Sequence, residues 1–87
     1  MWFVYILRCA DDALYIGVTN DLANRLVKHK EGSASHFTAS RRPLHLAYFE
    51  VCRSKDEAFE RERQLKGWTR AKKEALIAGD RNTLKAL

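Results

Sequence analysis

The chain opens with a segment that is apolar at almost every position. One face of this segment, if extended, carries Trp2, Val4 and Ile6, and the other carries Phe3, Tyr5 and Leu7. Strands that are apolar on both faces are typical of positions covered on both sides, so residues 2–9 predict the central strand of a sheet. A turn at residues 10–13 and a second strand at residues 14–19 complete a predicted hairpin.

The length of the hairpin loop decides whether two tyrosines share a face. With a two-residue loop Tyr5 would lie opposite Val18, and Tyr15 would point to the other side of the sheet. With three loop residues Tyr5 lies opposite Gly17, on the same face as Tyr15. We therefore predict a bulged three-residue loop with Asp12 near the left-handed region, which Asp tolerates.

A helix is predicted over residues 21–31, ended by Gly32. Thr19 or Asn20 can cap this helix. Its buried stripe is formed by Leu22, Leu26 and Val27. Arg25 and His29 lie four residues apart, so they occupy neighbouring positions beside that stripe. The first helix thus presents a guanidinium and an imidazole on one face.

Residues 33–43 read as a polar loop and residues 45–52 as a third strand. Ser54, followed three residues later by Glu57, forms a capping box and predicts a second helix. The inward positions of this helix read Ala58, Phe59, Glu62 and Leu65, and its outward charges are Glu60, Arg61 and Arg63. A carboxylate at Glu62 must therefore be paired, protonated or bound to a metal ion.

The C-terminal part reads as helical. Gly67 suits a left-handed C-cap, Thr69 can cap a basic helix that reaches Ala78 before Gly79, and residues 80–87 form a last turn or two. The elements then run β-β-α-β-α-α. We predict an α/β (α+β) fold with a small, mainly antiparallel three-stranded sheet flanked by helices, and one domain over residues 1–87.

Charge and cysteine content narrow the class of protein to which the chain can belong. The net charge is +5, and residues 53–73 hold eight basic and four acidic residues, an excess that favours a polyanionic partner over a merely solvated face. Cys9 and Cys52 lack the spacing of a metal site, so we expect reduced thiols and a cytoplasmic location. No membrane partner is expected.

The combined motifs resemble the small stand-alone GIY-YIG nuclease domains of bacteria over nearly the whole chain. The matching residues are Val4-Tyr5-Ile6-Leu7, Leu14-Tyr15-Ile16-Gly17, Asn20-Asp21-Leu22, Arg25-Leu26, His29, Phe37-Thr38, Arg41-Arg42-Pro43, Glu62, Leu65-Lys66 and Lys72-Lys73 with Leu76-Ile77. Val4 replaces the first glycine of the motif's name. Asn82 is a late candidate for an asparagine that some members use, and we leave it out of the site.

The resemblance implies hydrolysis of phosphodiester bonds with one divalent ion, Mg²⁺ or Mn²⁺. Tyr5 would orient or deprotonate the attacking water, and Tyr15 would hold the water network or the scissile phosphate. Arg25 would stabilise the phosphate, and His29 would relay a proton or contact the phosphate. Glu62 would hold the metal.

Nucleic acid is the expected partner, and DNA is favoured over RNA. The candidate contacts are Phe37, Thr38, Arg41, Arg42, Lys66, Arg70, Lys72 and Lys73. A domain of this size has no accessory module that would read duplex sequence, which favours single-stranded or irregular DNA. Repair, control of uptake and defence against mobile elements all stay open as pathways.

Each assignment has a simpler alternative. The two tyrosines could be half-buried strand aromatics, Arg25 could pair with Asp21 or Glu31, and Glu62 could pair with Lys66. The whole protein could be a nucleic-acid-binding module without catalysis. We expect a monomer, with a homodimer through an exposed Trp68 as a further alternative.

Overall fold

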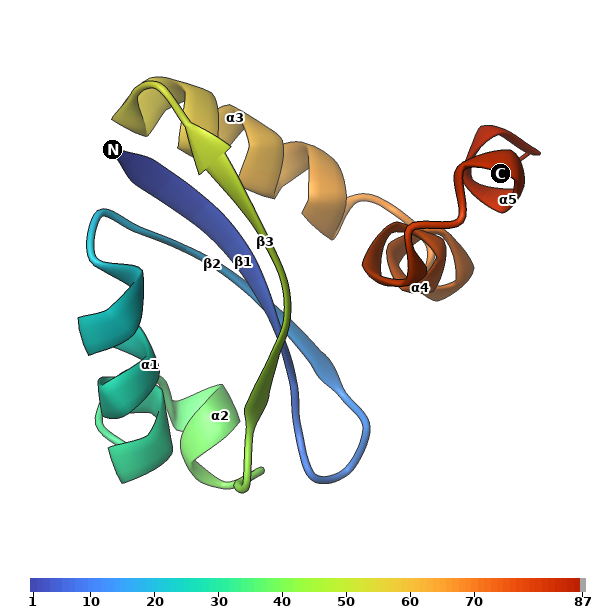
Figure 1. Cartoon of the computed structure of the whole chain (residues 1–87). Coiled ribbons are helices and arrows are strands. Elements are labelled where there is room, and N and C mark those ends of the chain that lie inside the picture. Colours follow the sequence, from blue (N-terminus) through green and yellow to red (C-terminus); the bar gives the residue numbers. More distant parts are fainter. Residues whose placement is uncertain (87) are drawn as a thin grey trace.

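The computed structural model describes residues 1–86, and Leu87 lies outside them. Three antiparallel strands, β1 (Trp2–Arg8), β2 (Leu14–Thr19) and β3 (His45–Cys52), form one sheet in the order β2-β1-β3 (Figure 1). The strand with two apolar faces is therefore central, as predicted. The α+β class and the order of the elements are confirmed.

The hairpin loop has three residues, as the register argument requires. The Cys9 amide donates to the carbonyl of Ala13 at 2.9 Å, and Asp12 in the loop between them has a φ of 69°. Tyr5 consequently lies opposite Gly17, so its ring projects from the same face as that of Tyr15. The predicted left-handed Asp12 and the shared face are both confirmed.

Helices cover both faces of the sheet (Figure 1). The helices are α1 (Leu22–Glu31), α2 (His36–Ala39), α3 (Lys55–Lys66), α4 (Arg70–Ala78) and α5 (Arg81–Ala86). On one face Val4 and Ile6 of β1 pack with Ala58 and Leu65 of α3. On the other face Tyr5 and Leu7 belong to a second core cluster, against which Leu22 and Leu26 of α1 pack.

Two details of the helix ends differ from the predictions. Asp21 caps α1, because its carboxylate accepts from the Asn24 amide at 3.1 Å. The hydroxyl of Thr19 is occupied by the backbone amide of Asp21. Gly67 ends α3 with φ −81°, in the right-handed region, whereas Gly32 and Gly79 do adopt the left-handed conformation.

The segment predicted as a loop contains the short helix α2. Ser35 caps it, with the side-chain oxygen 3.1 Å from the Phe37 amide. Four helical residues are too few to leave a periodic pattern in a sequence, so the helix was missed.

Burial also corrects the predicted exposure of four side chains. Val27 is 50% exposed and Phe59 is 42% exposed, while His29 is buried in the α1 face that contacts the sheet. Arg61, predicted to point outward, is half-buried and bonds the Glu50 carboxylate at 2.8 Å. Trp68 is half-buried against the α3 side of the core, so it does not offer the exposed surface that the dimer alternative requires.

An ionic cluster attaches α4 to the hairpin. Arg8 of β1 bonds Asp12 and Glu74, and Arg70 bonds the same two carboxylates. Hydrogen bonds from Arg8 lower the pKa of Glu74 to about 2.

Among residues 1–86, none of the helices combines the length and the apolar character that a membrane-spanning helix needs.

Candidate active site

Three rings from three elements meet on the α1 face of the sheet. The ring centroids of Tyr5 and His29 lie 5.7 Å apart, and those of Tyr15 and His29 lie 5.2 Å apart. Only 2% of Tyr5 is exposed, and its phenol lies over Gly17. A Cβ atom at Gly17 would stand 2.4 Å from the Tyr5 oxygen, so the absence of a side chain there makes room for the phenol.

His29 connects the phenol of Tyr5 to helix α2. Its Nε2 lies 2.8 Å from the Tyr5 oxygen, and its Nδ1 lies 2.9 Å from the Thr38 oxygen. The Thr38 hydroxyl donates to the carbonyl of Ser35, so it accepts from Nδ1–H. His29 is then the tautomer protonated at Nδ1, and the Tyr5 hydroxyl donates to its bare Nε2.

The environment keeps both groups of this hydrogen bond neutral. Burial raises the pKa of Tyr5 well above its usual range, and the neighbouring Tyr15 and Glu62 raise it further, while Arg25 opposes them. Burial lowers the pKa of His29, and the positive charge of Arg25 lowers it further. A proton that leaves the Tyr5 oxygen therefore has an unprotonated nitrogen directly beside it.

Arg25 of α1 and Glu62 of α3 shift the pKa of the Tyr5 phenol in opposite directions. Arg25 has no ion-pair partner among residues 1–86, so the predicted alternatives with Asp21 and Glu31 are not formed. The Glu62 carboxylate lies 3.4 Å from the Lys66 ammonium, and 18% of its side chain is exposed. The alternative ion pair of Glu62 is therefore present as a long contact.

Glu62 is the carboxylate of this site that fits a metal ion. Within residues 1–86 no three His, Cys, Asp or Glu side chains gather into a group that could hold a metal. Mg²⁺ is commonly bound through one or two carboxylates, several waters and substrate phosphates. A partly exposed single carboxylate such as that of Glu62 fits that chemistry.

A pocket of about 230 Å³ adjoins the ring cluster. Its lining residues are Leu14, Tyr15, Ile16, Phe37, Lys66 and Lys73. Tyr15 and Phe37 form an aromatic pair there, with centroids 6.0 Å apart. The Arg41 guanidinium lies 3.9 Å from the centroid of the Phe37 ring, and Asp11 bonds it at 3.0 Å.

The other predicted nucleic-acid contacts have different surroundings. Thr38 is fully buried behind His29, so its side chain does not reach the surface. Arg42 bonds the carbonyls of Ala39 and Lys30. Arg70 belongs to the ionic cluster described above, and the Lys72 ammonium lies 4.3 Å from the centroid of the Trp68 ring.

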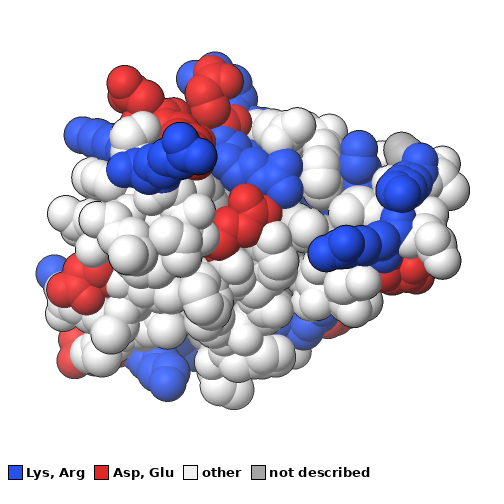
Figure 2. Space-filling view, turned by 45° about the horizontal axis from the view of Figure 1, so that its top comes forward, with Lys and Arg blue, Asp and Glu red and all other residues white. Residues whose placement is uncertain are grey.

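Acidic side chains divide the basic surface. Figure 2 shows Lys and Arg beside Asp and Glu at the top of the molecule, further basic side chains at the right, and a wide area of other residues below. Arg61 and Arg63 of α3 each pair with a glutamate. The excess positive charge of residues 53–73 is thus only partly available to a polyanion.

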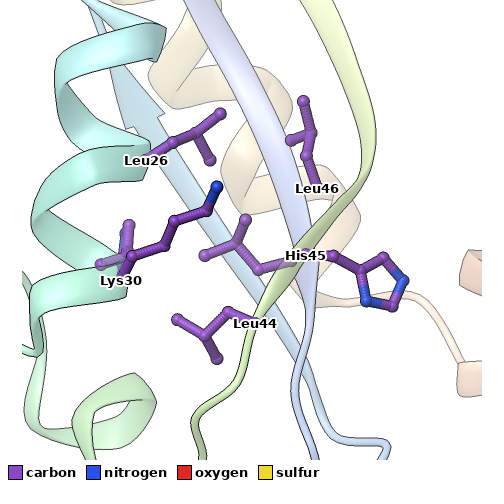
Figure 3. Close-up of a pocket in the computed structure, with 7 residues that line it drawn as sticks. Leu26, Lys30, Leu44, His45 and Leu46 are labelled. Atoms are coloured by element: carbon purple, nitrogen blue, oxygen red, sulfur yellow. The ribbon is translucent and has the colours of Figure 1, made fainter.

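A second pocket lies between α1 and β3 (Figure 3). Leu26, Leu44 and Leu46 face this space, Lys30 extends across it, and the ring of His45 points away. The pocket measures about 110 Å³ and also touches His29. We assign it to loose packing of α1, because it is small and mainly apolar.

Two features of this site were not predicted. Thr38 was expected to contact nucleic acid, yet it positions His29, and Ser35 holds the Thr38 hydroxyl. The Ser35 cap followed by Thr38 was visible in the sequence, but nothing in it indicated that α2 packs against His29. Nothing in the sequence indicated that Asp11 accepts a hydrogen bond from Arg41.

Comparisons with known proteins place the chain in a family. The family model described as the GIY-YIG catalytic domain matches residues 1–75. A UPF0213 protein of Bacillus pumilus is 45% identical over 75 residues, which cover 86% of this chain and 76% of that protein. A UPF0213 protein of Staphylococcus aureus is also 45% identical, and 92% of its length is covered.

A solved structure agrees with this placement. The solution structure of a UPF0213 protein from Bacillus halodurans matches with a TM-score of 0.60 and 37% identity, over 92% of this chain and 86% of that one. The paired tyrosines, the shared hairpin face and these matches lead to one conclusion: this chain belongs to the GIY-YIG nuclease domain family.

Proposed function

We propose that this protein is a metal-dependent endonuclease that hydrolyses phosphodiester bonds of DNA, with single-stranded DNA preferred. The observation that carries the proposal is the hydrogen bond of 2.8 Å from the buried Tyr5 hydroxyl to the neutral His29. Two charged residues, Arg25 and the single carboxylate Glu62, both shift the pKa of this Tyr5 phenol.

Tyr5 and His29 together serve as the base in this proposal. A free phenolate is disfavoured in the interior, because burial raises the pKa of Tyr5. When Tyr5 takes a proton from the attacking water, its own proton passes to Nε2 of His29. The bond from Nδ1–H to Thr38 then holds the charged imidazolium in place. General-base catalysis of this kind contributes roughly 10²- to 10⁴-fold.

Arg25 and Glu62 act on the phosphate in this proposal. Arg25 donates to the phosphate oxygens and stabilises the charge that develops on them. Glu62 would hold one Mg²⁺ or Mn²⁺ ion, which when bound polarises a phosphoryl oxygen. Tyr15 packs against His29 and would position the phosphate or its water.

Cleavage of labelled oligonucleotides tests the proposal. Purified protein is incubated with one single-stranded oligonucleotide and with its duplex, in Mg²⁺, in Mn²⁺ and in EDTA. We expect cutting that requires a metal and is faster on the single strand. Salt-sensitive binding without any cutting would refute the nuclease and favour a binding module.

Two substitutions separate chemistry from binding. Arg25→Ala and Glu62→Gln should abolish cleavage and leave the fold and most of the binding intact. Lys28→Ala is the matched control, because Lys28 is exposed on α1 and belongs to no part of the site. Parallel loss of binding and cleavage in both variants would contradict the assigned roles.

A further inference from the structure

The pocket beside the ring cluster combines an aromatic wall with two cations. Tyr15 and Phe37 supply the wall, and Lys66 and Lys73 supply the cations. Lys73 has no ion-pair partner among residues 1–86, and the side chain of Lys66 is 58% exposed. Flat aromatic surfaces beside basic residues bind single-stranded nucleic acid through base stacking and phosphate contacts.

Two residues connect this pocket to the candidate active site. Tyr15 lines the pocket and also packs against His29, with ring centroids 5.2 Å apart. Lys66 lines the pocket and lies 3.4 Å from the carboxylate of Glu62. The pocket therefore directly adjoins His29 and Glu62 of the candidate active site.

The dimensions and the rigidity of the pocket suit a planar ring. Its volume of about 230 Å³ is below the roughly 300–1,000 Å³ of sites for drug-sized ligands, so it accepts a ring system rather than a whole nucleotide. Arg41 supports the Phe37 ring from 3.9 Å and is itself held by Asp11 and by the Phe37 carbonyl. Phe37 thus keeps its orientation although 39% of it is exposed.

We propose that this pocket receives one unpaired nucleobase of the nucleotide next to the scissile phosphate. This proposal rests on the proposed nuclease function and specifies its substrate. A base in a duplex is paired and stacked, so it must leave the helix before it reaches Tyr15 and Phe37. The pocket therefore selects strands that are single or locally unpaired at the cut.

Fluorescence of 2-aminopurine tests the pocket without cleavage. A set of single-stranded oligonucleotides of one sequence carries the probe at successive positions along the strand, and each is titrated with wild-type protein in EDTA. We expect strong quenching at one position, which lies beside the cut where cutting is observed, and none in the matching duplex. Equal quenching at all positions, or in the duplex, would overturn the proposal.

Substitutions identify the aromatic wall. Phe37→Ala should remove the position-specific quenching and weaken binding about tenfold, in line with the loss of one base stack. Phe59→Ala is the matched control, because Phe59 is exposed to a similar extent and lies on α3 outside the pocket. Unchanged quenching in Phe37→Ala would overturn the proposal. Thermal melting checks the fold, and Lys73→Ala provides a second test if Phe37→Ala does not fold.

An abasic substrate distinguishes failure of this proposal from failure of the nuclease proposal. Removal of the single base beside the cut should lower the cleavage rate about tenfold relative to removal of a distant base. Metal-dependent cutting without this position effect would refute the pocket alone. Position-specific quenching without any cutting would refute the nuclease and keep the pocket as a binding site.

Discussion

The direction of the hydrogen bonds around His29 is set by residues from three elements. Thr38 donates to Ser35 and so accepts from Nδ1–H, which leaves Nε2 free to accept from Tyr5. A buried phenol that donates to a neutral imidazole is arranged to lose its proton in one direction.

Tyr5→Phe should remove the proton relay and keep the packing of the ring. We expect cleavage to fall roughly 10²- to 10⁴-fold, because the base is lost. Stability should fall by about 1–3 kcal/mol, because His29 loses a buried partner. Single-turnover cleavage and thermal melting measure the two effects.

Tyr48→Phe is the matched control for Tyr5→Phe. It also removes a hydroxyl that bonds a side chain, here that of Glu50, but on the α3 face of the sheet. A similar loss of cleavage in both variants would contradict a specific role of the Tyr5 hydroxyl.

The pH dependence should report the neutral state of His29. The groups that face it are Tyr5, Tyr15, Thr38 and Arg25. Burial, and then Arg25, lower its pKa below the usual value of about 6.5. His29 therefore stays neutral at pH 7, and protonation on acidification removes the acceptor for the Tyr5 proton.

Cleavage should accordingly be level from about pH 8 down to about pH 6.5 and decline only below that value. His29→Gln should lower the rate and abolish this acidic limb. Single-turnover rates across the pH range check both. A midpoint well above pH 6.5 in the wild-type protein would show that His29 is not the titrating acceptor.

At the scale of elements, the hairpin and two helix contacts assemble the site. The three-residue loop sets the β1–β2 register that places Tyr5 over Gly17. Helix α2 adds Thr38 behind His29. The ionic cluster of Arg8 and Glu74 attaches α4 to the hairpin, and α4 carries Lys73 to the pocket.

Gly17→Ala should damage the site by displacing the Tyr5 phenol, which the hairpin register places over Gly17. Its Cβ would stand 2.4 Å from the Tyr5 oxygen, so the phenol must move away from His29. We expect a destabilisation of about 1–3 kcal/mol from overpacking and a larger proportional loss of cleavage. Denaturant unfolding and cleavage assays measure the two effects.

Gly67→Ala is the matched control for Gly17→Ala. Its φ of −81° suits alanine, and the nearest atom to a Cβ there is the Gln64 carbonyl oxygen at 3.5 Å. We expect this variant to cleave normally. If Gly17→Ala cleaves as well as Gly67→Ala does, the position of the phenol is not critical.

At the scale of the whole molecule, the net charge of +5 overstates the surface open to a polyanion. Arg61, Arg63 and Arg70 are paired with carboxylates, whereas Lys73 has no such partner among residues 1–86. Binding should therefore depend on a few cations near the pocket rather than on the total charge.

The salt dependence of binding tests this view. The double variant Lys66→Ala/Lys73→Ala should lower the slope of log K against log salt by about 1.4 for single-stranded DNA, at about 0.7 for each lost phosphate contact. Lys28→Ala should leave the slope unchanged. Fluorescence anisotropy at several salt concentrations measures it, and equal slopes for all three proteins would exclude the two lysines from the interface.

The sequence alone determined the central strand, the hairpin and the common face of Tyr5 and Tyr15. These features depend on alternation and on loop length, which are local properties. The capping box at Ser54 could be predicted for the same reason, because its residues lie within one turn of the helix. The family motifs supplied the candidate roles of Arg25 and Glu62.

Only the tertiary structure decided which side chains have partners. It buried His29 in place of Val27, turned Arg61 toward Glu50, and brought Thr38 of α2 behind the imidazole. Each of these outcomes depends on how one element packs on another. The periodicity of a helix leaves the rotation of that helix about its own axis open by one position either way. The proton relay and the aromatic pocket are therefore products of packing, built on a hairpin that the sequence already specified.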